Sequence, residues 1–357
     1  MTVLRPRRVA GALLAAGIAA GVGLSATAAV AAPASSGRAV TAGARWLSGQ
    51  FENAAHKPVR NGTHFEAKYG KTWYPDYGEN ADAIFGLVAA GTQPHKVAVA
   101  LKYLARTIGA YADTSGAAGG PYDGSLGKAA VAAEVAHVSG LPATHFGGHN
   151  LLALLKKDEC TAADSTTGCV AKGAPRNIFA GISDSFVILA EARAGGTYAP
   201  SAAAVHYFLS LQCGDGGFTS GTAPCGAKGT PDLDSTSYAL MALEALHNHP
   251  ARVARTITYL RSQQKRAGYW VSQKVPNVNS TGLAAAALAA RGVDVSAARR
   301  WLRSQQIPAG HAHAGAFRYA GTFVKTGAAV SPSVLATAQA LPGLVAHGSL
   351  AVLRAGR

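Results

Sequence analysis

The sequence predicts an all-α protein, a closed (α/α)6 ring of about twelve helices built from six helix-pair repeats. Two observations support this fold class. An aromatic or leucine pair recurs in a helical pattern at spacings of 42 to 57 residues. Each pair is followed by a loop rich in Gly, Pro, Asn and Thr, and then by an apolar stretch dominated by alanine. The chain therefore alternates amphipathic helices with helices that are apolar on every side.

The first helix of each unit contains the recurring pair and often ends on glutamine. The pairs are Trp46-Leu47, Tyr103-Leu104, Leu154-Leu155, Phe208-Leu209, Tyr259-Leu260 and Trp301-Leu302, and glutamines follow at Gln50, Gln212, Gln263 and Gln305. These helices carry charged residues on one side, so we expect them to form the outer layer of the protein.

The second helix of each unit has few charges on any face and must be buried nearly all round. Several of these helices open with Asp, Ser or Thr and four close on glycine, which is typical of helix caps. They are expected at residues 82–91, 128–140, 184–196, 234–246, 280–292 and 333–344. A closed ring with these helices inside needs no polar end caps, whereas the alternative, an open helical solenoid, does.

The first 31 residues have the pattern of a signal peptide rather than of a folded segment. Three arginines precede the apolar run 9–24, and Ala29-Val30-Ala31 resembles a cleavage site. An uncleaved membrane anchor is the alternative, but the run is shorter than the roughly 20 residues that a span needs. We expect a secreted, extracellular protein with a flexible N-terminus at 32–40 and one domain at 41–350.

The formal net charge of +15 favours an anionic cell-wall or membrane surface as a partner. Loss of residues 1–31 removes three arginines and leaves +12. The sequence has no basic run interleaved with aromatic residues, so nucleic-acid binding is not expected. We expect a monomer.

The four cysteines are expected to form disulfides, because an exported protein folds in an oxidising compartment. Cys160 and Cys169 flank one short polar stretch, and Cys213 and Cys225 flank another. Local pairing within each couple is the natural choice among three possible connectivities.

The repeats resemble those of the α/α-toroid superfamily of squalene and terpenoid cyclases, protein prenyltransferases and cobalamin carriers. In that family a glutamine follows the aromatic-aliphatic pair, and glycine and an aromatic residue come next. The matching residues are Tyr259-Leu260, Gln264, Gly268 and Trp270 in one unit, Phe208-Leu209, Gln212, Gly216 and Phe218 in another, and Trp301-Leu302, Gln305, Gly315 and Phe317 in the last.

Glutamines of this motif can bond the unpaired backbone groups at helix ends and so tie neighbouring units together. We therefore expect a structural role for Gln212, Gln263, Gln264 and Gln305.

One segment resembles the acidic motif of proton-initiated cyclases. Asp232 and Asp234 precede Ser235 and Thr236 at the start of the fourth inner helix. The resemblance implies that Asp234 donates a proton to an alkene or epoxide and that Asp232 is its neighbour. The competing interpretation, which we favour, is that Asp234 caps the helix. The chain is only 7% aromatic, although a carbocation needs aromatic faces.

The starts of the inner helices would surround one mouth of the ring, the expected ligand site. The residues expected there are Tyr74, Asp76, Tyr77, Asn80 or Asp82, Asp184, Asp234 and Asn279. We expect no metal and no cofactor; a corrinoid is a subordinate possibility, because the extra β-domain of cobalamin carriers is lacking.

Three functions remain open at this point. The first is binding of an apolar or amphipathic ligand, or of a partner, in the central cavity without catalysis. The second is a terpenoid cyclase-type isomerase that uses Asp234. The third is a carbohydrate-active (α/α)6 enzyme, which would need two carboxylates and several tryptophans, whereas the chain has four tryptophans.

Overall fold

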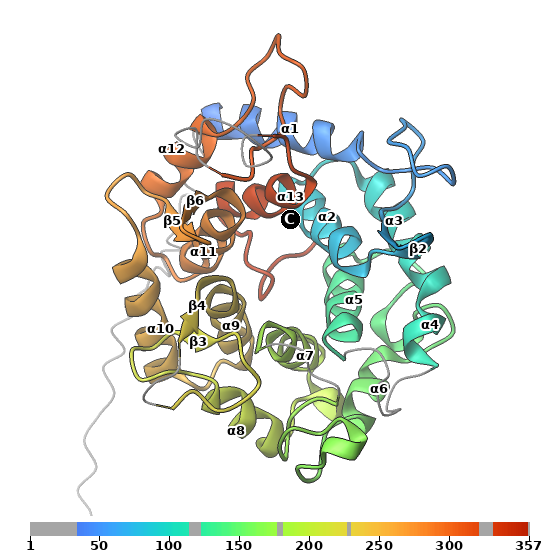
Figure 1. Ribbon diagram of the computed structural model, residues 1–357, viewed down its shortest axis with the longest axis vertical. Coiled ribbons are helices and arrows are strands. Elements are labelled where there is room, and N and C mark those ends of the chain that lie inside the picture. The colour runs from blue at the N-terminus through green and yellow to red at the C-terminus, as the bar shows by residue number, and fades with distance from the viewer. Residues whose placement is uncertain (1–33, 114–122, 177–180, 227–229, 321–330, 356–357) are drawn as a thin grey trace, which may run out of the picture. The chain divides into compact units, whose positions relative to one another are not determined.

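The computed structural model describes residues 34–113, 123–176, 181–226, 230–320 and 331–355. Six helices form an inner ring in which each contacts the next and the last contacts the first (Figure 1). These are α2 (Tyr77–Ala90), α5 (Asp123–Ala136), α7 (Gly181–Ala194), α9 (Leu233–Leu246), α11 (Val278–Ala290) and α13 (Val334–Leu344). The contact between α13 and α2 closes the ring, which confirms the predicted toroid and excludes the open solenoid.

Six further helices pack around the inner ring. They are α1 (Ala34–Ser48), α3 (Pro94–Thr107), α6 (Leu151–Lys157), α8 (Ala202–Ser210), α10 (Pro250–Gln263) and α12 (Ser296–Ser304). A short helix, α4 (Gly109–Ala112), and three 3-10 turns at Ala143–His145, Ser165–Thr167 and Gly196–Tyr198 complete the described helical part. The two layers follow from the sequence, because the alanine-rich helices are buried on every side and the outer ones on one side.

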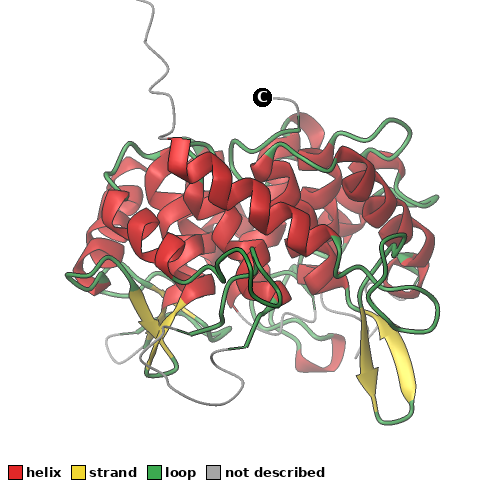
Figure 2. Cartoon of the chain, turned by 90° about the horizontal axis from the view of Figure 1, so that it is seen from above, coloured by secondary structure: helices red, strands yellow, loops and turns green. Residues whose placement is uncertain are grey.

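Three antiparallel hairpins precede inner helices on one face of the protein, seen at the bottom of Figure 2. They pair β1 (Glu66–Tyr69) with β2 (Thr72–Pro75), β3 (Phe218–Thr219) with β4 (Pro231–Asp232), and β5 (Trp270–Ser272) with β6 (Val275–Asn277). Each hairpin delivers the chain to the start of an inner helix. The starts of α2, α9 and α11 therefore lie on this hairpin face.

The opposite face is closed by the C-terminal segment, residues 345–355. Ser349 donates a hydrogen bond of 2.8 Å to Glu244 near the end of α9, and Ala355 bonds the carbonyl of Val135 in α5. Arg193 of α7 donates to the carbonyl of Leu353 at 3.2 Å. The C-terminal segment thus covers the interior of the ring on the face opposite the hairpins.

Glutamines of the motif stabilise the junctions between repeat units, as predicted, but two of the four expected glutamines, Gln263 and Gln305, are not the ones that do so. Gln212 donates to the carbonyls of Gly216 and Arg252 and to the hydroxyl of Thr256 at 2.9–3.2 Å. Gln264 donates to Gly268 at 3.0 Å. In the last unit the bridging residue is Gln306 rather than Gln305, which bonds its neighbour Ser304; Gln263 lies exposed on α10.

Threonines on the inner helices complete these junctions. Thr236, Thr281 and Thr337 accept hydrogen bonds of 2.9–3.1 Å from the backbone N–H groups of the motif aromatics. Those aromatics, Phe218, Trp270 and Phe317, are each at most 2% exposed. The motif is therefore a repeated structural joint, in agreement with the role expected from the sequence.

Two further expectations can be compared with the described residues. Residues 34–40, expected to be flexible, form the first half of α1, because Ala39 and Val40 pack into the core. The disulfides are Cys160–Cys169 and Cys213–Cys225, as predicted. The expected signal peptide, 1–31, lies outside the described residues, and no described helix is long and apolar enough to cross a membrane.

Candidate functional site

The ring axis is lined by side chains that stand six residues after the N-caps of the four inner helices α2, α9, α11 and α13. The capping residues are Asp76, Asp232, Asn277 and Ser333, each of which accepts a backbone N–H three residues on. The corresponding axial residues are Asp82, Tyr238, Leu283 and Gln339, and they border one small space on the axis together with Gly348 and Leu350 of the C-terminal segment. Its volume of about 10 Å³ leaves room for no more than one water molecule.

An ion pair lies next to this space. Lys128 Nζ of α5 is 2.9 Å from Asp82 Oδ2 of α2, and the second oxygen, Oδ1, is buried without a hydrogen-bond partner. Lys128 is also 5.3 Å from the ring centre of Phe186, a cation–π contact. Burial and the negative charge of Asp82 raise the pKa of Tyr238. The pair therefore places one cation and one incompletely bonded carboxylate close to the axis.

Aromatic rings from three inner helices meet beside the ion pair. Phe186 of α7 lies 4.7 Å from Tyr238 of α9 and 6.3 Å from Phe85 of α2, measured between ring centres. The rings of Phe85 and Phe186 are nearly parallel, at 12°. Together with Lys128 and Asp82 they form a group of five residues that we call the axial cluster.

Asp234 is not the helix cap that we favoured from the sequence. Asp232 has that position and accepts the N–H of Ser235 at 2.7 Å, because the helix begins one residue after Asp232. Asp234 lies in the first turn of α9, and its Oδ1 is buried without a hydrogen-bond partner. Burial raises the pKa of Asp234 to about 6. A hydrogen bond with Ser280 acts in the opposite direction, while the carboxylates of Asp232 and Asp82 raise the pKa further.

The other residues expected at the mouth do not form one group, and each lies in a different environment. Asn279 of α11 stands at the helix position that corresponds to Asp234, and it is buried. Asp76 caps α2, and the ring of Tyr77 packs against Tyr111 while its hydroxyl bonds the carbonyl of Thr107. Tyr74 lies on β2 and is half exposed. Asp76 and Tyr77 thus support α2 and its packing on the outer layer.

Asp184 also lies away from the axis. It is completely buried in α7, neither carboxyl oxygen has a hydrogen-bond partner, and burial raises its pKa well above the usual range. Burial and the charge of Asp184 raise the pKa of Tyr207 in outer helix α8, so Asp184 lies near the outer layer. The structure brings Asp82 and Asp234 together but not Asp184.

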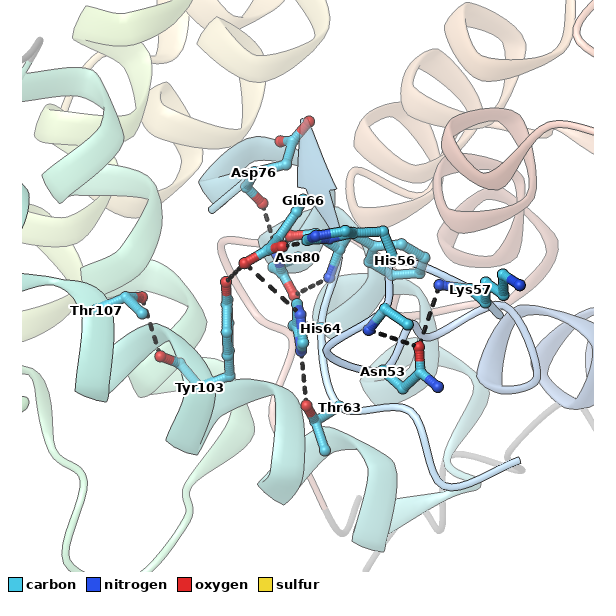
Figure 3. Close-up of polar contacts among 12 residues, drawn as sticks. Asn53, His56, Lys57, Thr63, His64, Glu66, Asp76, Asn80, Tyr103 and Thr107 are labelled. Carbon is cyan, nitrogen blue, oxygen red and sulfur yellow. Dashed lines mark hydrogen bonds and ion pairs between the residues drawn. The ribbon is translucent and has the colours of Figure 1, made fainter. Parts of the chain in front are cut away.

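A polar cluster that the sequence did not reveal lies at the base of the β1–β2 hairpin (Figure 3). Glu66 accepts the hydroxyl of Tyr103 at 2.8 Å and forms an ion pair with His56 Nδ1 at 2.7 Å. His64 Nε2 is 3.7 Å from Glu66, and its ring stacks on Tyr103 with centres 4.1 Å apart. This Glu66 cluster fastens the hairpin to α3.

The sequence contained one signal for that cluster. His64 and Glu66 alternate with buried Phe65, the two-residue period of a strand, so both polar side chains are on the same side. Burial lowers the pKa of His64 and raises that of Glu52, whose backbone pairs with His64. No group of three or more His, Cys, Asp or Glu in the described part of the chain has the arrangement of a metal site.

Solved structures with the same architecture were found, although neither a family model nor a curated protein sequence matches the chain. Type II terpene cyclase MstE from Scytonema is 15% identical with a TM-score of 0.58, over 87% of this chain and 97% of the cyclase. Unsaturated glucuronyl hydrolase from Bacillus sp. GL1 is 12% identical with a TM-score of 0.56, over 90% and 99%.

The protein is an (α/α)6 toroid. The two neighbours are enzymes that act on different substrates, and at such low identity the similarity shows the fold alone. A protein from Actinoplanes, 14% identical with a TM-score of 0.56 over 87% of this chain and 98% of its own, has the same fold. The function of this toroid must therefore be inferred from its own site.

The axial cluster and Asp234 provide two kinds of chemistry in this toroid. The rings of Phe85, Phe186 and Tyr238 are buried and form an apolar group, and the Asp82–Lys128 pair beside them carries charges of both signs. A carboxyl with a pKa of about 6 can hold a proton near neutral pH and release it to a bound molecule. The site thus combines buried aromatic rings, an ion pair and a carboxyl group whose pKa is raised.

Proposed function

We propose that this protein is a secreted toroid that binds a small apolar or amphipathic ligand at the hairpin-side mouth of the ring, without catalysis. The observation that carries the proposal is the meeting of Phe85, Phe186 and Tyr238, from three different inner helices, beside the ion pair of Asp82 and Lys128. Apolar walls with a few polar groups are typical of small-molecule sites.

Each part of the cluster has a place in this proposal. The aromatic rings would cover the apolar body of the ligand, while Lys128 and Asp234, both partly exposed, would meet its polar end. The C-terminal segment covers the opposite end of the ring, so the ligand would enter and leave from the hairpin face. Binding requires no further chemistry from these residues.

Binding can be tested with the chain that begins at Ala32 and a panel of isoprenoid alcohols and fatty acids, measured by native mass spectrometry. An isoprenoid panel is suitable because MstE was solved with geranylgeranyl dihydroxybenzoate. We expect one ligand per chain and a loss of at least tenfold in affinity in Phe186→Leu and Lys128→Met. Tyr269→Leu, on the outer layer, is the control. Failure of every probe to bind, or equal binding by the axial variants, would contradict the proposal.

A second function, acid-initiated cyclisation, is favoured by one specific observation. Asp234 combines a pKa of about 6 with a buried, unbonded Oδ1, and both are useful for a proton donor. The carboxyl would give its proton to an alkene carbon, the resulting cation would be stabilised by the rings of Phe186 and Tyr238, and loss of another proton would give an isomer of the same mass.

The two functions differ in their products. If Asp234 is an acid, incubation with a polyprene yields a cyclised product of unchanged mass in gas chromatography, and Asp234→Asn binds the polyprene but forms no product. Recovery of the polyprene unchanged from the wild-type protein supports binding alone. A carbohydrate-active role has less support, because none of the four tryptophans belongs to the axial cluster; Trp46, Trp270 and Trp301 belong to the outer layer and its junctions, and Trp73 to a hairpin.

A further inference from the structure

A second hollow lies outside the ring, at the seam where the first outer helix, α1, meets the last unit. Gln306 donates a hydrogen bond of 2.8 Å to the carbonyl of Ala39 in α1. Gly315 adopts a φ of +94°, and a Cβ at this position would stand 2.5 Å from the carbonyl oxygen of Ala42. Between these contacts opens a pocket of about 520 Å³, which is within the range of small-molecule sites. We call it the seam pocket.

The pocket lies where two alanines take the places that two arginines have at an equivalent seam. Where α8 meets α10, Gln212 donates to the carbonyl of Arg252, and a Cβ on Gly216 would stand 2.4 Å from the carbonyl of Arg255. Arg252 and Arg255 therefore correspond to Ala39 and Ala42.

Both arginine side chains fill their own seam. Arg252 donates to Gln212 Oε1 at 2.9 Å, and Arg255 donates to the carbonyls of Cys213 and Gly214 at 2.9 and 3.0 Å. The side chains of Ala39 and Ala42 are too short to make these contacts. The residues that correspond to Gln212, Cys213 and Gly214 therefore line the seam pocket. These are Gln306, Ile307 and Pro308.

The walls of the seam pocket are strongly basic. Arg38, Arg45 and Arg303 line it, and no carboxylate does. The sequence explains this imbalance, because the chain contains no Asp or Glu before Glu52 and none after Asp294. The seam joins α1 to residues 303–315, so acidic residues are missing from both of its sides. No described carboxylate forms an ion pair with Arg38 or Arg45.

An indole group provides a donor in the same wall. Trp46 lines the pocket, and its Nε1–H is buried with no hydrogen-bond acceptor. An unpaired buried donor costs free energy, and a ligand oxygen would remove that cost. The indole also offers a flat apolar face, beside Ile307 and Pro308, to the body of a ligand.

We propose that the seam pocket binds a small organic oxyanion, a sugar phosphate or a sugar carboxylate, independently of the axial cluster. The arginines would hold the acid group through charge-assisted hydrogen bonds. Trp46 would contact the sugar ring and donate its Nε1–H to a ring oxygen or hydroxyl. The volume is much larger than an inorganic ion needs, which favours an acid group attached to an organic body.

Isothermal titration calorimetry with glucose 6-phosphate, glucuronate, inorganic phosphate and neutral glucose tests this proposal. We expect at least one of the two sugar acids to bind with a stoichiometry of one, more weakly as salt is added, and glucose not to bind. Ala42→Arg should abolish binding, because it introduces the side chain that Arg255 provides at the equivalent seam. Arg45→Gln should weaken it about tenfold.

Two controls keep the result interpretable. Arg261→Gln removes an exposed arginine from α10, outside the pocket, and should leave the affinity unchanged. Circular dichroism and the melting temperature show whether Ala42→Arg is folded. Binding of glucose as tightly as of the acids, binding of inorganic phosphate alone, no binding by either sugar acid, or unaltered binding by folded Ala42→Arg would each overturn the proposal.

Discussion

The two sides of the inner helices use polar residues in opposite ways. On the side facing the outer layer, Thr236, Thr281 and Thr337 have their hydrogen bonds completed by the backbone of the glutamine motif. On the side facing the axis, Asp82 and Asp234 each keep a buried carboxyl oxygen without a partner. Complete bonding stabilises the ring, whereas incomplete bonding costs stability and leaves a group available to a ligand.

The largest effect is expected from removing a motif aromatic on the bonded side. Trp270 is fully buried and donates from Nε1 to the carbonyl of Leu260 at 2.7 Å. Trp270→Ala should lower the free energy of unfolding by about 4 kcal/mol, because it creates a large cavity. Urea denaturation followed by circular dichroism measures this, and exposed Trp73→Ala should change it by less than about 0.5 kcal/mol. Equal effects would mean that the motif is not a structural joint.

The second largest effect on stability concerns Gln212 and Gln263, for which the sequence predicted the same structural role. Gln212 makes three hydrogen bonds as donor and accepts one from Arg252, whereas Gln263 is exposed. Gln212→Ala should cost about 3 kcal/mol, since it leaves buried groups unpaired. Gln263→Ala, measured by the same urea denaturation, should be almost neutral. A large loss in the second variant would contradict the division between the two residues.

The repeat made the fold predictable, and its periodicity also explains which details were not. Six amphipathic and six apolar helices require two layers whatever the exact helix boundaries. The choice between Gln305 and Gln306 could not be made, because both are glutamine and both lie just after the end of α12, where the helical period no longer sets the direction of a side chain.

The axial cluster was harder to predict for a related reason. An inner helix that is apolar all round has no hydrophobic face from which to infer which side meets the axis. Asp82 was included among the mouth residues, but its partner Lys128 was not, and Asp184 was placed with it although it lies near the outer layer. The Glu66 cluster joins segments about 40 residues apart, a pairing that needs tertiary structure.

Asp234→Asn tests whether the buried carboxyl of Asp234, on the side of α9 that faces the axis, makes the stability of the protein depend on pH. The folded-state pKa of Asp234 is raised from 3.8 to about 6, so ionisation opposes folding. Below about pH 3 the wild type and the variant should differ little, because the carboxyl is then mostly protonated in both the folded and the unfolded state. As the pH rises through 6, the wild type should lose stability relative to Asp234→Asn.

The size of this loss should be on the order of 2 kcal/mol by pH 7.5, because partial exposure of the side chain reduces the full effect of the shift. Urea midpoints of both proteins from about pH 3 to about pH 8 provide the measurement. A constant difference over this range would show that Asp234 is an ordinary, solvated carboxylate.

The smallest effect distinguishes Asp232 from Asp234, two residues along the same helix. Asp232 caps α9 by accepting the N–H of Ser235 at 2.7 Å, so Asp232→Ala should destabilise the protein by about 1 kcal/mol. Asp232→Asn, which retains a capping oxygen, should restore most of this, since Asn277 has the same place in α11. Because Asp232→Asn leaves the axis intact, it should also keep the ligand affinity, whereas a loss of binding in this variant would show that the bonded and unbonded sides of α9 act together.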